Sequence, residues 1–242
     1  MKTLVYLYGF LSYLTFVLGS ITSIEAAPSL KVGVAALPVS DGDPHRSVSV
    51  FSTYSWSPTF ETLTTFLEDG QLVGELATSW EQIEPRVWHF SLRENVKFSN
   101  GRPLRAHDVV HSLEYLQTSH GQITSTARDL SAIAGASVID DYTLSVRTHK
   151  PSAILPRLFA ALYIVEPDHW DALGPDKFAR DPIGTGPFKI KSWERGKVYY
   201  EANKLSWRAP QIETMEVLQL PETTSRLQGI ATGAIDIAIG MG

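Results

Sequence analysis

His107 and His111 stand four residues apart, with Asp108 between them. On a helix this spacing places both imidazoles on one face, as a zinc site requires. The glutamate that acts as general base in helical metalloprotease motifs is missing, and the sequence offers no identifiable third ligand. A solvated helix face explains the two histidines equally well, so we predict no metal site and no cofactor.

The other patterns that could indicate chemistry are weak. Gly184-Thr185-Gly186 lacks the spaced glycines and the Gly-Lys-Ser/Thr ending of a phosphate-binding loop, so we interpret it as a tight turn. No Gly-x-Ser-x-Gly nucleophile elbow occurs, and Asp140-Asp141 is typical of a turn. The chain has no cysteine, which excludes disulfides and thiolate chemistry. We therefore predict no catalytic residue and a protein that is not an enzyme.

The elements that would position a site follow from the apolar periodicity. A strand–helix–strand order at the end of the chain predicts an α/β sheet with a crossover. The expected strands are 30–35, 88–93, 143–147, 188–190, 217–220 and 235–239, and the expected helices are 109–116, 153–159 and 223–232, with weak helical spacing at 60–67.

The composition favours a folded soluble protein. Hydrophobic residues make up 43% and charged residues 19%, which argues against disorder. The formal net charge is -5 and no basic stripe occurs, so nucleic acid is not an expected partner.

The N-terminus is typical of a secretory signal peptide over 1–26. Lys2 precedes an apolar run at 4–18, and small and polar residues lead to a cleavage site near Ala26. A membrane anchor is the alternative, but at about 1.5 Å per residue the run is too short for a bilayer core of roughly 30 Å. These features predict a periplasmic protein.

Several blocks of sequence, taken in order, are similar to one known family. The most specific block is 88–104, WHFSLRENVKFSNGRPL, which is followed by Asp108-Val109-Val110. It is accompanied by Asp43-Pro44-His45 and by the blocks 60–63, 70–80, 182–188 and 233–238. Together they resemble the family-5 extracellular solute-binding proteins, which are the dipeptide, oligopeptide and nickel binders of ABC importers. Two positions depart from the family: Arg105 replaces a helix-capping threonine, and Gly74 replaces a proline.

The resemblance implies an α/β fold, namely a lobe like those of type II periplasmic binding proteins with an inserted α+β subdomain. The core subdomain would comprise 27–57 and 176–242, and the insertion 58–175. The family's second lobe is expected to be absent from this chain, which would leave it a weak binder by itself. Ligand contacts are expected from Tyr54, Trp56 and Tyr163, with Gly184, Thr185 and Gly186 forming a structural turn near the cleft.

The resemblance further implies a monomer that captures a peptide or other small ligand and delivers it to the membrane permease subunits of an ABC importer. The identity of the ligand stays open among peptides, nickel complexes and sugars. A sensor or chaperone that reuses the fold is an alternative function, and a secreted hydrolase is a further one.

Overall fold

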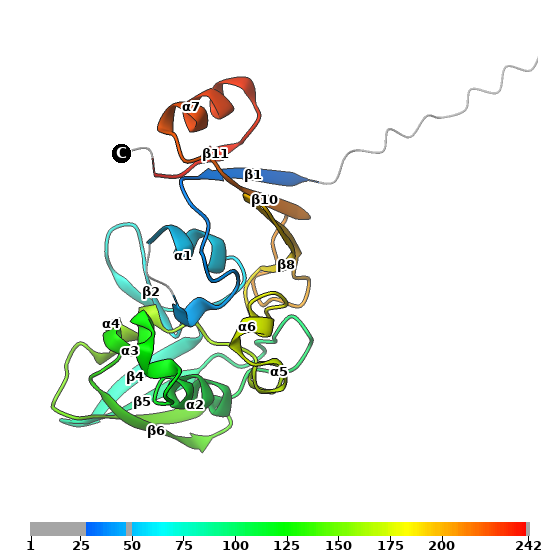
Figure 1. Ribbon diagram of the computed structural model, residues 1–242. Helices are drawn as coiled ribbons and strands as arrows, with labels where there is room; N and C mark the ends of the chain where they lie inside the picture. Colours follow the sequence, from blue (N-terminus) through cyan, green and yellow to red (C-terminus); the bar gives the residue numbers. More distant parts are fainter. Residues whose placement is uncertain (1–27, 47–49, 241–242) are drawn as a thin grey trace, which may run out of the picture.

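The computed structural model describes residues 28–46 and 50–240. Two larger sheets organise these residues, one near each end of the molecule, with α1 (Val50–Trp56) between them (Figure 1), and a two-stranded sheet is the third. The predicted signal peptide at 1–26 lies outside the described residues. Among the described residues, no helix combines the length and the apolar character that crossing a membrane needs.

The first sheet has five strands in the order β11-β1-β10-β9-β8. The strands are β1 (Ser29–Val34), β8 (Phe188–Glu194), β9 (Lys197–Ala202), β10 (Thr214–Gln219) and β11 (Ile237–Ala238). β1 runs parallel to both β10 and β11, whereas β9 pairs antiparallel with β10 and with β8. Helix α7 (Thr223–Thr232) carries the chain from β10 across β1 to β11, which confirms the expected crossover.

The second sheet is antiparallel and has the order β4-β5-β7-β6. Its strands are β4 (Ala77–Glu84), β5 (Val87–Leu92), β6 (Ile133–Asp140) and β7 (Thr143–Thr148). Along β5 the buried residues are Trp88, Phe90 and Leu92, so the strand has one apolar face, as its alternation predicts. That face packs against α2 (Ala106–Tyr115) and forms the largest core of the chain.

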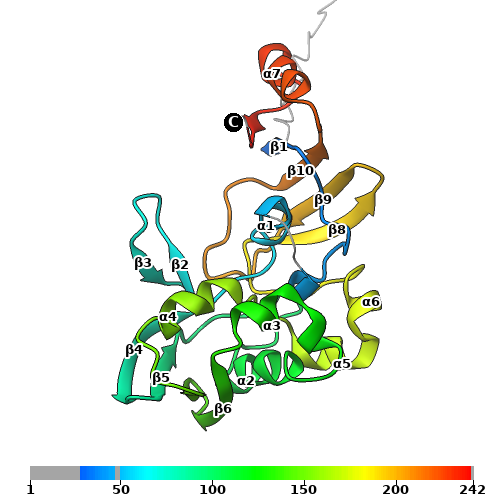
Figure 2. The ribbon, with the colours of Figure 1, turned by 60° about the vertical axis from the view of Figure 1, so that its left-hand side comes forward.

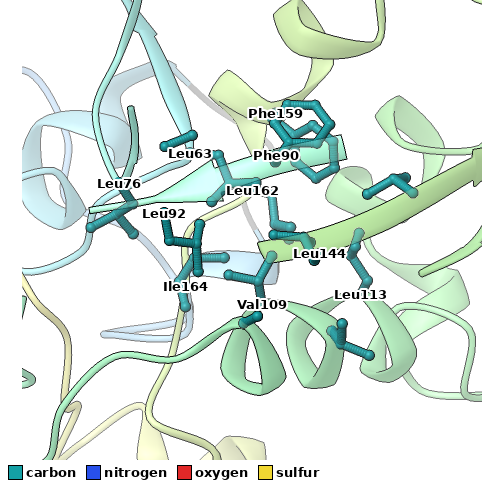
Figure 3. Packing of buried hydrophobic residues seen from close by; sticks show 14 of the residues in the cluster. Leu63, Leu76, Phe90, Leu92, Val109, Leu113, Leu144, Phe159, Leu162 and Ile164 are labelled. Atoms are coloured by element: carbon teal, nitrogen blue, oxygen red, sulfur yellow. The ribbon is translucent and has the colours of Figure 1, made fainter. Parts of the chain in front are cut away.

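Aromatic and aliphatic side chains fill this core. The rings of Phe90 and Phe159 meet edge to face with centroids 4.8 Å apart, and Val109 and Leu113 approach from α2 (Figure 3). Smaller clusters support the five-stranded sheet and the region around Trp56. Each cluster removes large apolar side chains from water, which is the main favourable contribution to folding.

The remaining elements are short. They are helices α3 (Ser125–Asp129), α4 (Leu155–Leu158), α5 (Pro167–Leu173) and α6 (Pro175–Phe178), the 3₁₀ turns η1 (Pro44–Arg46), η2 (Gly121–Ile123) and η3 (Phe159–Ala161), and strands β2 (Thr64–Phe66) and β3 (Leu72–Gly74). The expected helix at 153–159 is therefore only α4, continued by η3.

The expectation of helical spacing at 60–67 is wrong. The segment contains β2, which pairs antiparallel with β3 and projects as a hairpin (Figure 2). Threonine and phenylalanine favour strands, and the turn at its tip uses Gly70 with φ of 81°. The hairpin turn therefore determines the secondary structure of this segment, although the spacing of its apolar residues resembles that of a helix.

Candidate ligand-binding site

The carboxyl ends of β1, β10 and β11 meet at one edge of the five-stranded sheet, because the three strands are parallel. In open α/β sheets, ligands bind outside the carboxyl ends of the strands. The segment that leaves β1 at this edge, 35–41, is the first candidate wall of a ligand site.

The main chain of 35–39 is unusual in this segment. Among the described residues, no backbone hydrogen bond involves any of these five positions, although the ladder ends next to them with Leu220 N–H donating to the Val34 carbonyl at 2.7 Å. Backbone donors and acceptors away from water are almost always paired. This irregular segment therefore offers unpaired main-chain groups at the edge where a ligand is expected.

A cavity of about 650 Å³ lies beside this segment. Its lining combines apolar groups with two arginines and two acidic residues, so the formal charges of the lining sum to zero. The lining residues are Leu37, Pro38, Val39, Asp41, Arg180, Trp193, Glu194, Arg195, Gly196 and Gln219. The volume is in the range that small-molecule and peptide ligands occupy. We call this hollow, with segment 35–39, the edge site.

Contacts behind the edge site hold its loop in place. The indole N–H of Trp56 donates to the Asp41 carbonyl at 2.7 Å, and the Gly42 N–H donates to the Ala179 carbonyl at 2.8 Å. A Cβ at Gly42 would lie 2.7 Å from that same carbonyl oxygen, so the close approach needs glycine. The loop is thus anchored at 41–42, just beyond its free backbone.

A second hollow of about 550 Å³ lies near the base of the β2–β3 hairpin. Tyr163 lines it together with Thr53, Glu75 and Arg208. Burial raises the pKa of Tyr163 to about 12, so its hydroxyl stays protonated and can donate or accept a hydrogen bond. We call this hollow the groove.

An ion cluster borders the groove, with Glu61 buried and Arg208 partly exposed. Arg208 Nε lies 2.6 Å from Glu61 Oε1 and Arg208 Nη2 lies 2.8 Å from Glu75 Oε1. The indole N–H of Trp207 also donates to Glu61, which is fully buried. Burial raises the pKa of Glu61, while Arg208 acts in the opposite direction. The cluster ties Trp207 and Arg208 to Glu61 before β2 and to Glu75 after β3.

The other predicted site residues lie in different settings. Trp56 is fully buried in a cluster with Phe60 and Trp170, whereas Tyr54 is exposed on α1 and lines neither the edge site nor the groove. The turn at Gly184 and Gly186 lies against the backbone of Pro58 and Thr59, where a Cβ would come within 2.2 Å and 2.5 Å of carbonyl oxygens. Its glycines serve close backbone packing, and Thr185 between them is fully buried.

The two histidines considered for zinc are separate from these hollows. His107 is exposed, and His111 Nε2 lies 2.9 Å from Asp171 Oδ1. Within the described part of the chain, no group of three or more histidine, aspartate or glutamate side chains is arranged to hold a metal ion.

Sequence reasoning missed the segment 35–39. A usable signal was present: an expected strand ends at 35, and the following residues include Pro38, which cannot continue a central strand. The sequence could not show that the segment follows a strand held between two parallel neighbours. Those neighbours, β10 and β11, lie about 180 and 200 residues further along the chain.

Similarity to known proteins agrees with this architecture. The HTH-type transcriptional regulator SgrR of Escherichia coli K12 is 32% identical over 165 residues, which cover 67% of this chain and 28% of SgrR. MoaA of Agrobacterium tumefaciens R10, solved with mannopinic acid, superposes with a TM-score of 0.78 at 26% identity, covering 89% of this chain and 45% of MoaA.

A third protein is a periplasmic binding protein associated with an ABC transporter. DppA of Helicobacter pylori, solved with the peptide STSA, superposes with a TM-score of 0.74 at 25% identity, covering 86% of this chain and 45% of DppA. This chain therefore spans less than half the length of the proteins it matches. Residues 71–242 match the family described as bacterial extracellular solute-binding proteins, family 5 Middle. With a two-sheet α/β lobe and a matching sequence over most of its length, the chain belongs to the family-5 bacterial extracellular solute-binding proteins.

Proposed function

We propose that this protein is the substrate-binding component of an ABC importer and that it captures peptides or similar small solutes in the periplasm. The ligand lies at the edge site, and the membrane permease subunits receive it. Family membership supports this function, as do related structures that hold a peptide or mannopinic acid.

The free backbone of 35–39 is the observation that carries the proposal. An extended peptide can add to an exposed strand edge through main-chain hydrogen bonds, with side chains pointing alternately away from the ladder. Such pairing depends little on peptide sequence. The neighbouring cavity of about 650 Å³ then accommodates the side chains, and its balanced charges favour neither a cationic nor an anionic one.

The domain organisation belongs to the same proposal. We assign 27–57 and 176–242 to the core subdomain and 58–175 to the insertion, with the opposite wall of the cleft supplied by a second lobe. Trp56 would shape the loop that carries 35–39. Tyr163 lines the groove and Tyr54 lines neither hollow, so neither tyrosine is assigned to the ligand at the edge site. The working unit would be a monomer that closes on its ligand by a hinge motion.

Backbone recognition is testable with N-methylated peptides. Calorimetry would compare a tripeptide with copies in which one main-chain N–H is replaced by N–CH₃, and with control copies that differ only in a side chain. We expect at least one N-methylated copy to bind roughly tenfold more weakly, because a hydrogen-bond donor is lost and an acceptor on the protein is left unpaired. The side-chain copies should differ less. Equal binding of all N-methylated copies would contradict backbone docking.

A sensor function is the second candidate, because the curated relative is named as a transcriptional regulator and shares 165 residues with this chain. The location of the protein separates the two functions. N-terminal sequencing after cell fractionation should give a periplasmic product that begins near Ala27 if the protein serves an importer. A cytoplasmic product that keeps Met1 and shifts promoter DNA in a gel would favour the regulator instead.

A further inference from the structure

Arg226 is a buried cation on α7 that no described carboxylate neutralises. Only 2% of the residue is exposed, and none of the ion pairs among the described residues includes it. Removing a guanidinium from water is costly unless its donors are satisfied. Its hydrogen bonds should therefore reveal what the side chain does.

Carbonyl groups at the ends of two strands accept these hydrogen bonds. Arg226 Nη1 donates to the carbonyls of Leu220 and Pro221, which follow β10, and Nη2 donates at 2.6 Å to the carbonyl of Gly240, which follows β11. Nη2 also donates at 3.1 Å to the hydroxyl of Thr223 at the start of α7. One planar guanidinium thus joins the segments that leave β10 (220–221) and β11 (239–240) at the same edge of the sheet; we call these segments the two exits.

The two exits flank β1. The Leu220 N–H donates to the Val34 carbonyl at 2.7 Å, and the Ile239 N–H donates to the Gly33 carbonyl at 2.9 Å. The stem of Arg226 passes close to the same strand, since a Cβ on Gly33 would lie 3.7 Å from Arg226 Cγ. The distance between the exits therefore determines how the end of β1 is held, and 35–39 begins there.

We propose that Arg226 is a positioning residue that fixes the carboxyl ends of β10 and β11 on either side of β1 and so sets the path of 35–39. It acts through the two strand exits and does not touch the ligand. The expected effect of Arg226 on peptide binding rests on the proposed function. Its effect on the ends of β10 and β11 does not depend on that function. Charge-assisted hydrogen bonds to carbonyl oxygens are strong and directional, as such a role requires.

The test compares Arg226→Met and Arg226→Lys with the wild type. Amide hydrogen exchange should accelerate by about tenfold or more at Leu220 and Ile239 in Arg226→Met, because local opening no longer has to break the guanidinium contacts. Amides of β5 and β7 in the other sheet should be unchanged. Arg226→Lys keeps the charge but cannot span both exits, so its exchange should be intermediate.

The control is Arg128→Met, which makes the same substitution at an exposed arginine on α3 and should leave these amides unchanged. Unaltered exchange at Leu220 and Ile239 in a folded Arg226→Met protein would overturn the proposal. If that variant does not fold, Arg226→Lys decides alone: acceleration confined to the two exits supports the proposal, and wild-type exchange overturns it.

Ligand binding provides the second measurement. Peptide affinity should fall by roughly tenfold in Arg226→Met, with partial recovery in Arg226→Lys, as expected for a residue that orders the docking segment. Normal affinity combined with faster exchange would overturn the positioning role. Because this chain is expected to bind weakly by itself, affinities are measured with the second lobe present. If exchange changes as expected but the wild type with its second lobe binds no peptide, the proposed function is contradicted and the structural role of Arg226 stays supported.

Discussion

Asp43 and His45 are two fully buried titratable residues behind the loop of the edge site. Burial raises the pKa of Asp43 to about 6, although the His45 N–H and Arg46 act in the opposite direction. Burial lowers the pKa of His45 to about 3, and His111 contributes in the same sense. Between these values both side chains are neutral in the folded protein, so this pair buries no net charge.

The pair predicts opposite pH dependences for its two members. A raised carboxyl pKa stabilises the folded state at low pH, and that contribution is lost as the pH rises from 3.8 to about 6. For His45, the lowered pKa makes the folded state less stable as the pH falls from 6.5 to about 3. The wild type should therefore show a flat stability profile near pH 5, because the two effects offset one another there.

Substituting Asp43 should expose this compensation. From about pH 4 to about pH 7, the free energy of unfolding of Asp43→Asn should increase by about 2 kcal/mol relative to the wild type, since the variant has no carboxyl group to ionise. Urea unfolding at both pH values measures it. Asp69→Asn, at an exposed turn, serves as the control and should follow the wild type. A constant difference across this range would contradict the assignment.

Individual site residues were only partly predictable. Tyr163 could be nominated from the resemblance, and the structure places it in the groove. Segment 35–39 could not, because its significance comes from unpaired backbone groups, which no residue type encodes. Arg226 was equally hidden, since an arginine on an amphipathic helix is normally expected to face water.

At the level of elements, α2 shows how a helix begins without a capping side chain at its first position. Arg105 forms no side-chain cap, but its N–H donates at 2.8 Å to Asp108 in the first turn. Asp108 is fully buried and also lies 2.8 Å from Arg102 Nη1. The same carboxylate thus compensates for the missing threonine cap and pairs with Arg102, whose side chain is partly exposed.

Asp108→Ala should destabilise the protein by about 3 kcal/mol, because it removes the helix-start contact and leaves Arg102 without its shortest ion pair. Chemical denaturation measures the change. His107→Ala removes an exposed neighbour on the same turn and should cost less than about 0.5 kcal/mol. Similar losses in the two variants would show that Asp108 has no special role in starting α2.

Alternation made β5 predictable, but β9 (Lys197–Ala202), which also has one buried face, was not among the expected strands. The expectation of 88–93 agrees with β5 to within one residue, because its apolar and polar residues alternate. β4 was missed because most of its residues are exposed, so no apolar face is apparent. The strand expected at 235–239 is only Ile237–Ala238, since Ile235 instead packs against Gly229 of α7.

For the whole molecule, the cluster of Arg208, Glu61 and Glu75 links the two sheet regions. Arg208 lies in the connection between β9 and β10, while both glutamates lie before the four-stranded sheet. These partners are more than 130 residues apart in sequence. No local pattern predicts such a pairing, which is why the junction could not be derived before the structure, although the α/β class could.

Arg208→Met should lower the free energy of unfolding by about 2 kcal/mol, because it leaves the buried Glu61 carboxylate without its cation; the 41% exposure of Arg208 keeps the loss below that of a fully buried pair. Lys204→Met is the matched control: it breaks the Lys204–Glu213 pair, whose side chains are 57% and 44% exposed, and should cost under about 1 kcal/mol. Calorimetric unfolding distinguishes them. Equal losses would mean that the cluster does not hold the sheet regions together.

The free main chain of 35–39 has another consequence for the molecule. Unpaired main-chain donors and acceptors can also pair with a second copy of the protein, which leads to aggregation. Pro38 interrupts this row, because it has no N–H and cannot lie within a central strand. A neighbouring copy could therefore form only a short ladder here. The same proline limits how many residues of a ligand can be read through the backbone, so selectivity for ligand length and protection against self-association would share one origin.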